Sequence, residues 1–203
     1  MIAYQGSVKI MEAIGPAMSL WMEDNVHRVA PIALRQAAEA AGYSPDPSTQ
    51  NGAVCYRFPD EHSYALVSAG FNHPTLYVRD GKDLYTVLGN RDLKLKYSVH
   101  AEEDAIYRAA YQDTDSPGHG GTLALIALWA ACMQCAKTIV QGGVQLMIRD
   151  YWWTEKGSER PEWSKNVQEA DEYLANHGVT VVDVQRNFNF NTGLRFSGET
   201  YSV

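Results

Sequence analysis

Two short stretches of this sequence, HAE and CMQC, carry the residue types that metal chemistry needs. One imidazole and two thiols suit zinc, and three protein ligands leave the fourth position of a tetrahedral ion open, as in catalytic zinc sites. Zinc in such a site lowers the pKa of a bound water from 15.7 to about 7. Glu102, the last residue of HAE, is then expected to carry protons beside the metal without binding it. We predict that the zinc ligands are His100, Cys132 and Cys135.

The composition is that of an ordinary globular protein of 203 residues with a net charge of −7. Proteins that grip a nucleic-acid backbone show a basic face, whereas lysine and arginine are here outnumbered and scattered, so a nucleic-acid partner is not expected. Of the three cysteines, Cys55 lies in an apolar run and is predicted to be a buried small hydrophobe. The odd cysteine count, the CxxC pair, and the lack of a signal peptide or long apolar run predict a cytoplasmic protein without a membrane anchor.

The periodicity predicts one domain spanning residues 1–203, with a helical extension over about 1–43 and a polar, aromatic tail over about 187–203 that packs on a neighbour. Pro31 is expected to open a helix that stops at Gly42. Between the extension and the tail, strands and helices alternate. Strands are predicted at 54–58, 64–71, 123–129, 144–148 and 179–184, and helices at 100–112, 132–141 and 162–176. This order predicts a three-layer α/β/α sandwich around a mixed, mainly parallel, five-stranded sheet.

A cationic cluster comes directly before the predicted zinc histidine. It consists of Arg91, Lys94 and Lys96. The pattern leaves open whether this segment is a solvated loop, a phosphate contact or an oligomer contact.

Beyond the HxE and CxxC pair, which is typical of zinc deaminases, three motifs resemble those of the cytidine and deoxycytidylate (dCMP) deaminase family. The stretch SPDPSTQNGAV at 44–54 is similar to that family's entry to its first strand, and SAGFNHP at 68–74 resembles its S-x-G-[YF]-N loop. The stretch KYSVHAEEDAI at 96–106 is similar to the family's K-Y-x-x-x-H-A-E segment. The resemblance covers about residues 31–185 and implies a cytidine deaminase-like fold.

The resemblance also implies roles for individual residues. Glu102 would take a proton from the attacking water, protonate N3 of the pyrimidine and help ammonia leave. Asn72 would bond the sugar hydroxyl, while the backbone groups of Ala101 and Ala131 would contact the base edge. An aromatic residue of the run 151–153, represented by Tyr151, would stack on the base.

The sequence departs from the family pattern at three places. One is the loop after Asn72, which reads N-H-P where the family has N-G-x-P and which bears on the choice of substrate. The usual proline before the first CxxC cysteine is Ala131, which loosens a backbone constraint without removing a reacting group. The usual valine after S-T-x is Asn51, which changes the turn before the first strand of the family motif.

The activity implied by the resemblance is zinc-dependent hydrolysis of dCMP to dUMP and ammonia, in nucleotide biosynthesis. It further implies a homo-oligomer, often a hexamer, with allosteric regulation by dCTP and dTTP. Two alternatives stay open: deamination of another cytosine nucleoside, modified nucleotide or RNA base, and a non-catalytic protein that keeps zinc for regulation or assembly. Replacing Glu102 by glutamine separates an enzyme from the last of these.

Overall fold

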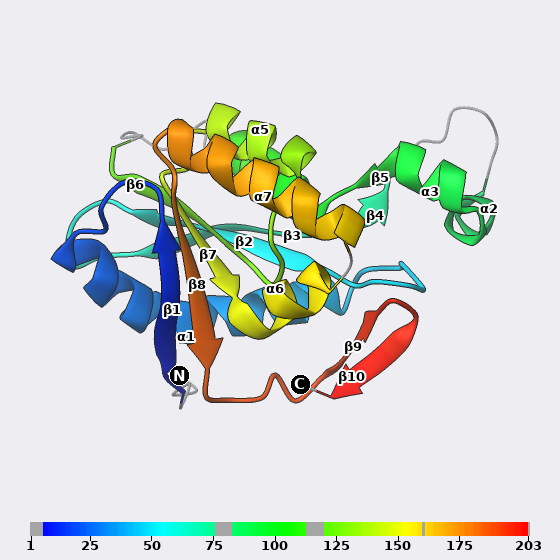
Figure 1. The fold of residues 1–203 in the computed structure, drawn as a ribbon, viewed down its shortest axis with the longest axis horizontal. Coiled ribbons are helices and arrows are strands. Elements are labelled where there is room, and N and C mark those ends of the chain that lie inside the picture. Colours follow the sequence, from blue (N-terminus) through cyan, green and yellow to red (C-terminus); the bar gives the residue numbers. More distant parts are fainter. Residues whose placement is uncertain (1–5, 76–82, 113–119, 160, 203) are drawn as a thin grey trace.

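The computed structural model describes residues 6–75, 83–112, 120–159 and 161–202. It shows an α/β protein in which helices cover both faces of a mixed six-stranded sheet (Figure 1). None of the helices among these residues is both long enough and apolar enough to cross a membrane. The predicted α/β sandwich is therefore confirmed at the level of its layers.

The sheet has the strand order β1-β8-β7-β6-β2-β3. Its strands are β1 Val8–Ile14, β2 Gly52–Phe58, β3 Ala65–Phe71, β6 Thr122–Ala127, β7 Leu146–Asp150 and β8 Thr180–Arg186. Strands β6, β7 and β8 run parallel, whereas β1 on β8, β2 on β6 and β3 on β2 are antiparallel. The predicted mixed sheet is confirmed, but it has six strands instead of five because β1 is added. Its pairings are not mainly parallel, because β2 and β3 as well as β1 pair in antiparallel fashion.

The two faces of the sheet pack against different helices. Ala124 and Ile126 of β6 face the layer of α1 (Leu20–Ala41), and Leu125 and Ala127 face the layer of α4, α5 and α7. The helices of the second layer are α4 Ala101–Gln112, α5 Met133–Gln141 and α7 Pro161–Asn176. An apolar run covered on both faces is typical of a central strand, and this predicted feature of β6 is confirmed.

The N-terminal segment differs from the helix expected over residues 1–43. Residues 8–14 form β1, because they pair with the distant strand β8. Helix α1 then begins after its N-cap Ser19 and continues through Pro31 to Ala41. Proline removes one hydrogen bond inside a helix, but the apolar residues on both sides of Pro31, such as Val29 and Leu34, are fully buried and pack both parts of α1 into the core.

Shorter elements complete the end of the sheet near the predicted zinc ligands. The two-residue strands β4 (His73–Pro74) and β5 (Ser98–Val99) pair with each other, and α2 (Leu84–Gly89) and α3 (Arg91–Tyr97) precede β5. All three residues of the cationic cluster therefore lie on α3, and the segment is a helix and not a loop. After β7, the chain forms α6 (Tyr151–Ser158).

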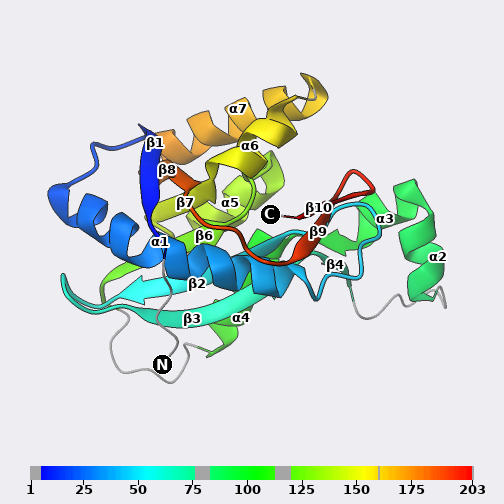
Figure 2. The same cartoon turned by 90° about the horizontal axis from the view of Figure 1, so that it is seen from below.

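The expected C-terminal tail contains a hairpin of β9 (Gly193–Phe196) and β10 (Glu199–Ser202). Figure 2 shows it folded back beside the segment that joins α1 to β2. The backbone N–H of Gln50 donates to the Arg195 carbonyl oxygen at 2.8 Å, and Gly198 N–H donates to the Ser48 carbonyl oxygen at 2.8 Å. The hairpin thus packs on its own chain.

Candidate active site

The predicted zinc ligands meet at one edge of the sheet, where β6 ends and the antiparallel strand β2 begins. His100 directly precedes α4, and Cys132 is the N-cap residue of α5. Both stretches therefore lie at helix N-termini, where the helix dipole favours negative charge and lowers the pKa of a thiol. The end of a parallel strand is also where α/β proteins usually bind ligands.

The three side chains lie close enough together to hold one metal ion. The His100 Nδ1 atom is 3.2 Å from the Cys135 Sγ atom and 3.4 Å from the Cys132 Sγ atom, and the two sulfurs are 3.5 Å apart. Tetrahedral zinc with ordinary Zn–S and Zn–N bonds separates its ligands by about 3.5–3.8 Å. The residues present therefore fit a zinc ion with little movement.

The two ligand stretches are tied together by the carboxylate of Glu103. Its Oε2 atom accepts a hydrogen bond from the backbone N–H of His100 at 3.2 Å. This bond gives a partner to one of the N–H groups that are left unpaired at the start of α4. Its Oε1 atom accepts from Gln134 Nε2 at 3.0 Å, inside the CxxC turn. A single carboxylate thus fixes the distance between the N-termini of α4 and α5.

Glu102 lies beside the ligand cluster and is only 2% exposed. Its Oε2 atom is 3.7 Å from Cys135 Sγ, and its Oε1 atom accepts from Asn51 Nδ2 at 3.2 Å. Burial raises the pKa of Glu102 to about 7, although the charge of His100 and the hydrogen bond from Asn51 lower it. A carboxyl group with this pKa exchanges protons readily at neutral pH.

The cluster itself favours a charged thiolate. Hydrogen bonds from Cys135 and His100 outweigh burial and lower the pKa of Cys132 to about 4. The hydrogen bond with Cys132 in turn raises the pKa of His100 to about 9. The hydrogen bond with Cys132 also raises the pKa of Cys135 well above 9, so one thiolate is shared by the other two groups, and binding a metal ion would release their protons.

The cluster opens into a pocket of about 280 Å³. Three aromatic residues from separate elements form its walls: Trp129 after β6, Trp163 on α7 and Phe196 on β9. Gly157 lines the pocket between the indoles, where a Cβ atom would be 3.3 Å from Trp163 Cδ1 and 3.4 Å from Trp129 Cζ3. Most of the other lining residues are polar or charged, so the pocket offers flat apolar surfaces beside many hydrogen-bonding groups, as a polar small molecule requires.

Sequence reasoning did not find these aromatic walls, because they come from three distant segments. Tyr151 is not among the residues that line the pocket, although it begins α6 nearby in the chain. Trp153 is fully buried and packs in the core against Trp129. None of the residues 151–153 lines the pocket, and its aromatic surfaces are Trp129, Trp163 and Phe196. Stacking of the base on a residue of this run stays a prediction.

The other predicted substrate contacts lie close to the ligands. Asn72 lines the pocket, but its side chain already makes two hydrogen bonds of 2.7–2.8 Å: Oδ1 accepts from Asn51 N–H and Nδ2 donates to the Thr49 carbonyl oxygen. Ala101 and Ala131 are fully buried next to the ligands. Asn72 therefore has a clear structural role, and a sugar contact would use its remaining acceptor capacity.

The three residues of the cationic cluster do not share one environment. Arg91 and Lys94 line the pocket, and Lys96 does not; its ammonium lies 5.3 Å from the centre of the Tyr97 ring. Lys94 forms an ion pair with Asp46, with Nζ 3.0 Å from Oδ2. Arg91 has neither a hydrogen bond nor an ion pair among the described residues.

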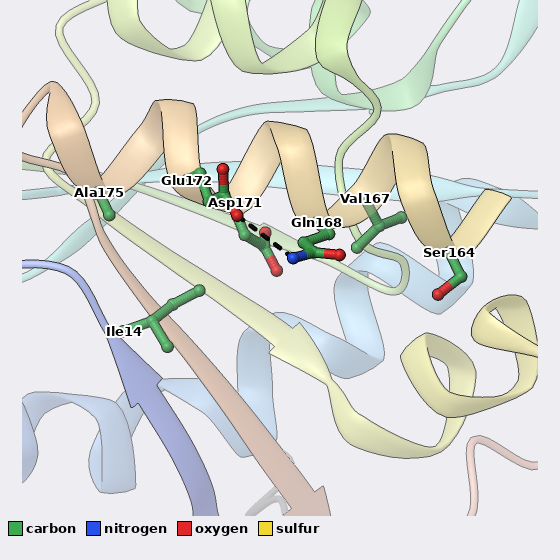
Figure 3. A pocket seen from close by; sticks show the side chains of 7 residues that line it. All are labelled: Ile14, Ser164, Val167, Gln168, Asp171, Glu172 and Ala175. Carbon is green, nitrogen blue, oxygen red and sulfur yellow. Dashed lines mark hydrogen bonds between the residues drawn. The ribbon is translucent and has the colours of Figure 1, made fainter.

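A second hollow, of about 410 Å³, lies between α7 and Ile14 at the end of β1 (Figure 3). Three of its polar side chains already have partners: Gln168 donates to Glu172 at 3.3 Å, and Asp171 pairs with the buried Arg149 at 2.7 Å. His100, Cys132 and Cys135 are not among its lining residues. The pocket beside Glu102 is therefore the candidate ligand site.

The fold and site together define an α/β protein with a potential zinc centre made by one histidine and two cysteines beside an acidic residue. No protein-family model and no curated protein matches the chain. Among solved structures, the dCMP deaminase of cyanophage S-TIM5 is similar over 77% of this chain and 97% of its own, at 17% identity and a TM-score of 0.49.

Two other deaminases are similar in the same way. The Rib2 deaminase of Aspergillus oryzae matches 74% of this chain and 81% of its own, at 16% identity and a TM-score of 0.47. The guanine deaminase of Nitrosomonas europaea matches 85% and 80%, at 16% identity and a TM-score of 0.39. Likenesses at this level carry no argument about activity, so a function has to be supported by the geometry of the site itself.

Proposed function

We propose that this chain is a zinc-dependent hydrolytic deaminase of cytosine mononucleotides that converts dCMP to dUMP and ammonia. The observation that carries the proposal is the position of Glu102, whose Oε2 atom lies 3.7 Å from Cys135 Sγ at the pocket. His100, Cys132 and Cys135 would hold the metal. When bound there, zinc supplies a Lewis acid that makes water nucleophilic at neutral pH.

The residues of the chain carry the protons and position the base. Glu102, with its pKa near 7, takes a proton from water and delivers it to N3 of the pyrimidine. The water oxygen forms a bond to C4, and the C4–N4 bond breaks after the second water proton has reached the amino group. Cytosine and water thus become uracil and ammonia, and Glu102 ends in its starting state.

The pocket size and its rim favour a mononucleotide over an oligonucleotide or a free base. A volume of about 280 Å³ is close to the lower end of small-molecule sites. The aromatic walls suit a flat base, and a phosphate can be met at the rim by Arg91, whose guanidinium forms two parallel hydrogen bonds with such groups. Lys94 is a weaker candidate because Asp46 already neutralises it.

The test is a panel of cytosine compounds assayed for ammonia release by the zinc-loaded protein. The panel contains dCMP, CMP, deoxycytidine, free cytosine and a tRNA stem-loop. We expect turnover to be fastest with dCMP. Faster turnover of the nucleoside or of the stem-loop would show that this compound, and not dCMP, is the substrate. Release of ammonia from none of the compounds would refute the proposed activity.

A further inference from the structure

We infer that Asn51 is a positioning residue for Glu102: it holds one carboxylate oxygen so that the other stays directed at the ligand cluster. This inference rests on the proposed function for its catalytic meaning, but the contact itself is a property of the fold. Asn51 lies in the last position before β2, and its Nδ2 atom donates to Glu102 Oε1 at 3.2 Å.

The orientation of the Asn51 amide follows from its neighbours. The backbone N–H of Gly52 lies 2.9 Å from Asn51 Oδ1. Since a backbone N–H can only donate, the oxygen end of the amide must face Gly52, and the NH₂ end is left for Glu102. A carboxylate is an acceptor, so the same orientation satisfies both contacts.

The backbone of Asn51 is fixed from both sides. Its N–H donates to Asn72 Oδ1 at 2.7 Å, and its carbonyl oxygen accepts from Asn72 N–H at 3.2 Å. On the other side, a Cβ atom at Gly52 would overlap the carbonyl oxygen of Ala37 in α1, so strand and helix are in backbone contact there. The amide donor therefore has little freedom to move away from Glu102.

A fixed donor matters because the last torsion of a glutamate side chain has a broad energy minimum. Without the contact, the two carboxylate oxygens can turn relative to the cluster. With Oε1 held by Asn51, Oε2 stays on the side of Cys135. Asn51 thereby sets the direction in which Glu102 presents its free oxygen.

The kinetic test compares Asn51→Ala with Ser68→Ala in the zinc-loaded protein. Ser68 is a matched control: its Oγ atom also donates one buried hydrogen bond to α4, at 2.6 Å from the Ala105 carbonyl oxygen, but it does not contact Glu102. A lost hydrogen bond to a charged group predicts a fall in kcat of about 10- to 100-fold for Asn51→Ala, with KM changed less than about threefold. Ser68→Ala should stay within about twofold of wild type in kcat, and Asn51→Gln should regain part of the loss.

Two kinetic outcomes would overturn the inference. A rise in KM with kcat retained would mean that Asn51 contacts the ligand directly. An equal loss of kcat in Asn51→Ala and Ser68→Ala would mean that both act only by holding α4 in place.

A second measurement does not depend on turnover. The side-chain NH₂ resonances of Asn51, assigned by their disappearance in Asn51→Ala, should shift in Glu102→Gln and stay in place in Ser68→Ala. Unmoved resonances in Glu102→Gln would refute the contact even in an active enzyme. If the wild type releases no ammonia from any cytosine compound, the proposed function fails, while the resonances still decide whether Asn51 holds Glu102.

Discussion

The ring of Phe196 stacks on the indole of Trp129, with the ring centroids 4.4 Å apart and the planes at 26°. Phe196 belongs to the C-terminal hairpin, and Trp129 follows the central strand that leads to Cys132. The hairpin is held there by Gln50, whose Oε1 atom accepts from Arg195 N–H at 3.1 Å. The last elements of the chain therefore complete the ligand pocket.

Replacing Phe196 by leucine should weaken ligand binding more than it slows turnover. An aromatic pair or base stack contributes about 0.5–3 kcal/mol, so we expect KM for dCMP to rise about five- to tenfold with kcat within about threefold. Phe190→Leu is the control, because Phe190 is a buried aromatic residue of the same segment that does not line the pocket. Equal effects of the two substitutions would show that Phe196 acts only through the stability of the tail.

Replacing Glu102 by glutamine should abolish turnover and leave the fold intact. The change removes proton transfer but keeps the shape of the side chain, and general acid–base catalysis contributes about 10²- to 10⁴-fold. Ammonia release, zinc content and the circular dichroism spectrum of wild type and Glu102→Gln should be compared. Ammonia release at the wild-type rate in the variant would show that Glu102 does not carry the protons. No release from either protein would leave a non-catalytic zinc protein as the better description.

The purified protein should bind about one zinc ion per chain, as a site with three protein ligands does. Cys132→Ser and Cys135→Ser should lose that zinc, and a chelator should lower the Tm of wild type. Cys55→Ala is the control: Cys55 is fully buried, and burial raises the pKa of its thiol to about 12. Mass spectrometry measures the zinc content per chain of each variant. An equal loss of zinc in Cys55→Ala would show that Cys132 and Cys135 are not the specific ligands.

Arg91→Ala should weaken the binding of nucleotides and leave the binding of nucleosides unchanged. If its guanidinium meets the phosphate, loss of charge-assisted hydrogen bonds should raise KM for dCMP about tenfold or more and leave KM for deoxycytidine unchanged. Lys96→Ala is the control, because Lys96 carries the same charge on the same helix but does not line the pocket. A similar rise for nucleotide and nucleoside would assign Arg91 a structural role.

The ion pair of His73 and Asp104 should make stability depend on pH. The interaction with Asp104, 3.5 Å away, raises the pKa of His73 above 6.5, even though burial lowers it. Burial raises the pKa of Asp104, but hydrogen bonds from His73, Arg108 and Phe71 outweigh burial and bring the pKa below 3.8. The pair therefore stabilises the fold fully between about pH 4 and 6.5 and loses this contribution above the raised pKa of His73 or below the lowered pKa of Asp104.

Urea unfolding of wild type and His73→Gln at about pH 5.5 and about pH 9 measures this dependence. The destabilisation caused by His73→Gln should be larger at the lower pH. A difference that is the same at both pH values would show that the charge of His73 contributes nothing.

Local sequence signals were enough for most elements and for the cluster of His100, Cys132 and Cys135, which could hold a metal ion. The β2–β3 hairpin, the buried run of β6 and the helices that follow His100 and Cys132 each have their own period or boundary residue. The ligands were recognisable because HxE and CxxC are short-range patterns. The segment Val8–Ile14 was mistaken for helix because its exposed positions do not alternate, and only pairing with the distant β8 makes it a strand.

The rest of the site depends on contacts between distant segments, which periodicity does not reveal. Asn51 looked like a departure from a turn motif, and its contact with Glu102 exists only once β2 and α4 are packed together. Phe196 lay in a tail of weak periodicity. Its place in the pocket follows from hydrogen bonds between β9 and the residues before β2.

Gly157 leaves room between the indoles of Trp129 and Trp163, and a single added methyl group would occupy part of it. Attempts to evolve the protein in the laboratory toward smaller or larger ligands therefore have a natural starting position that alters neither the metal ligands nor Glu102. Libraries built at this position would sample cavity shape while the chemistry of the centre stays constant.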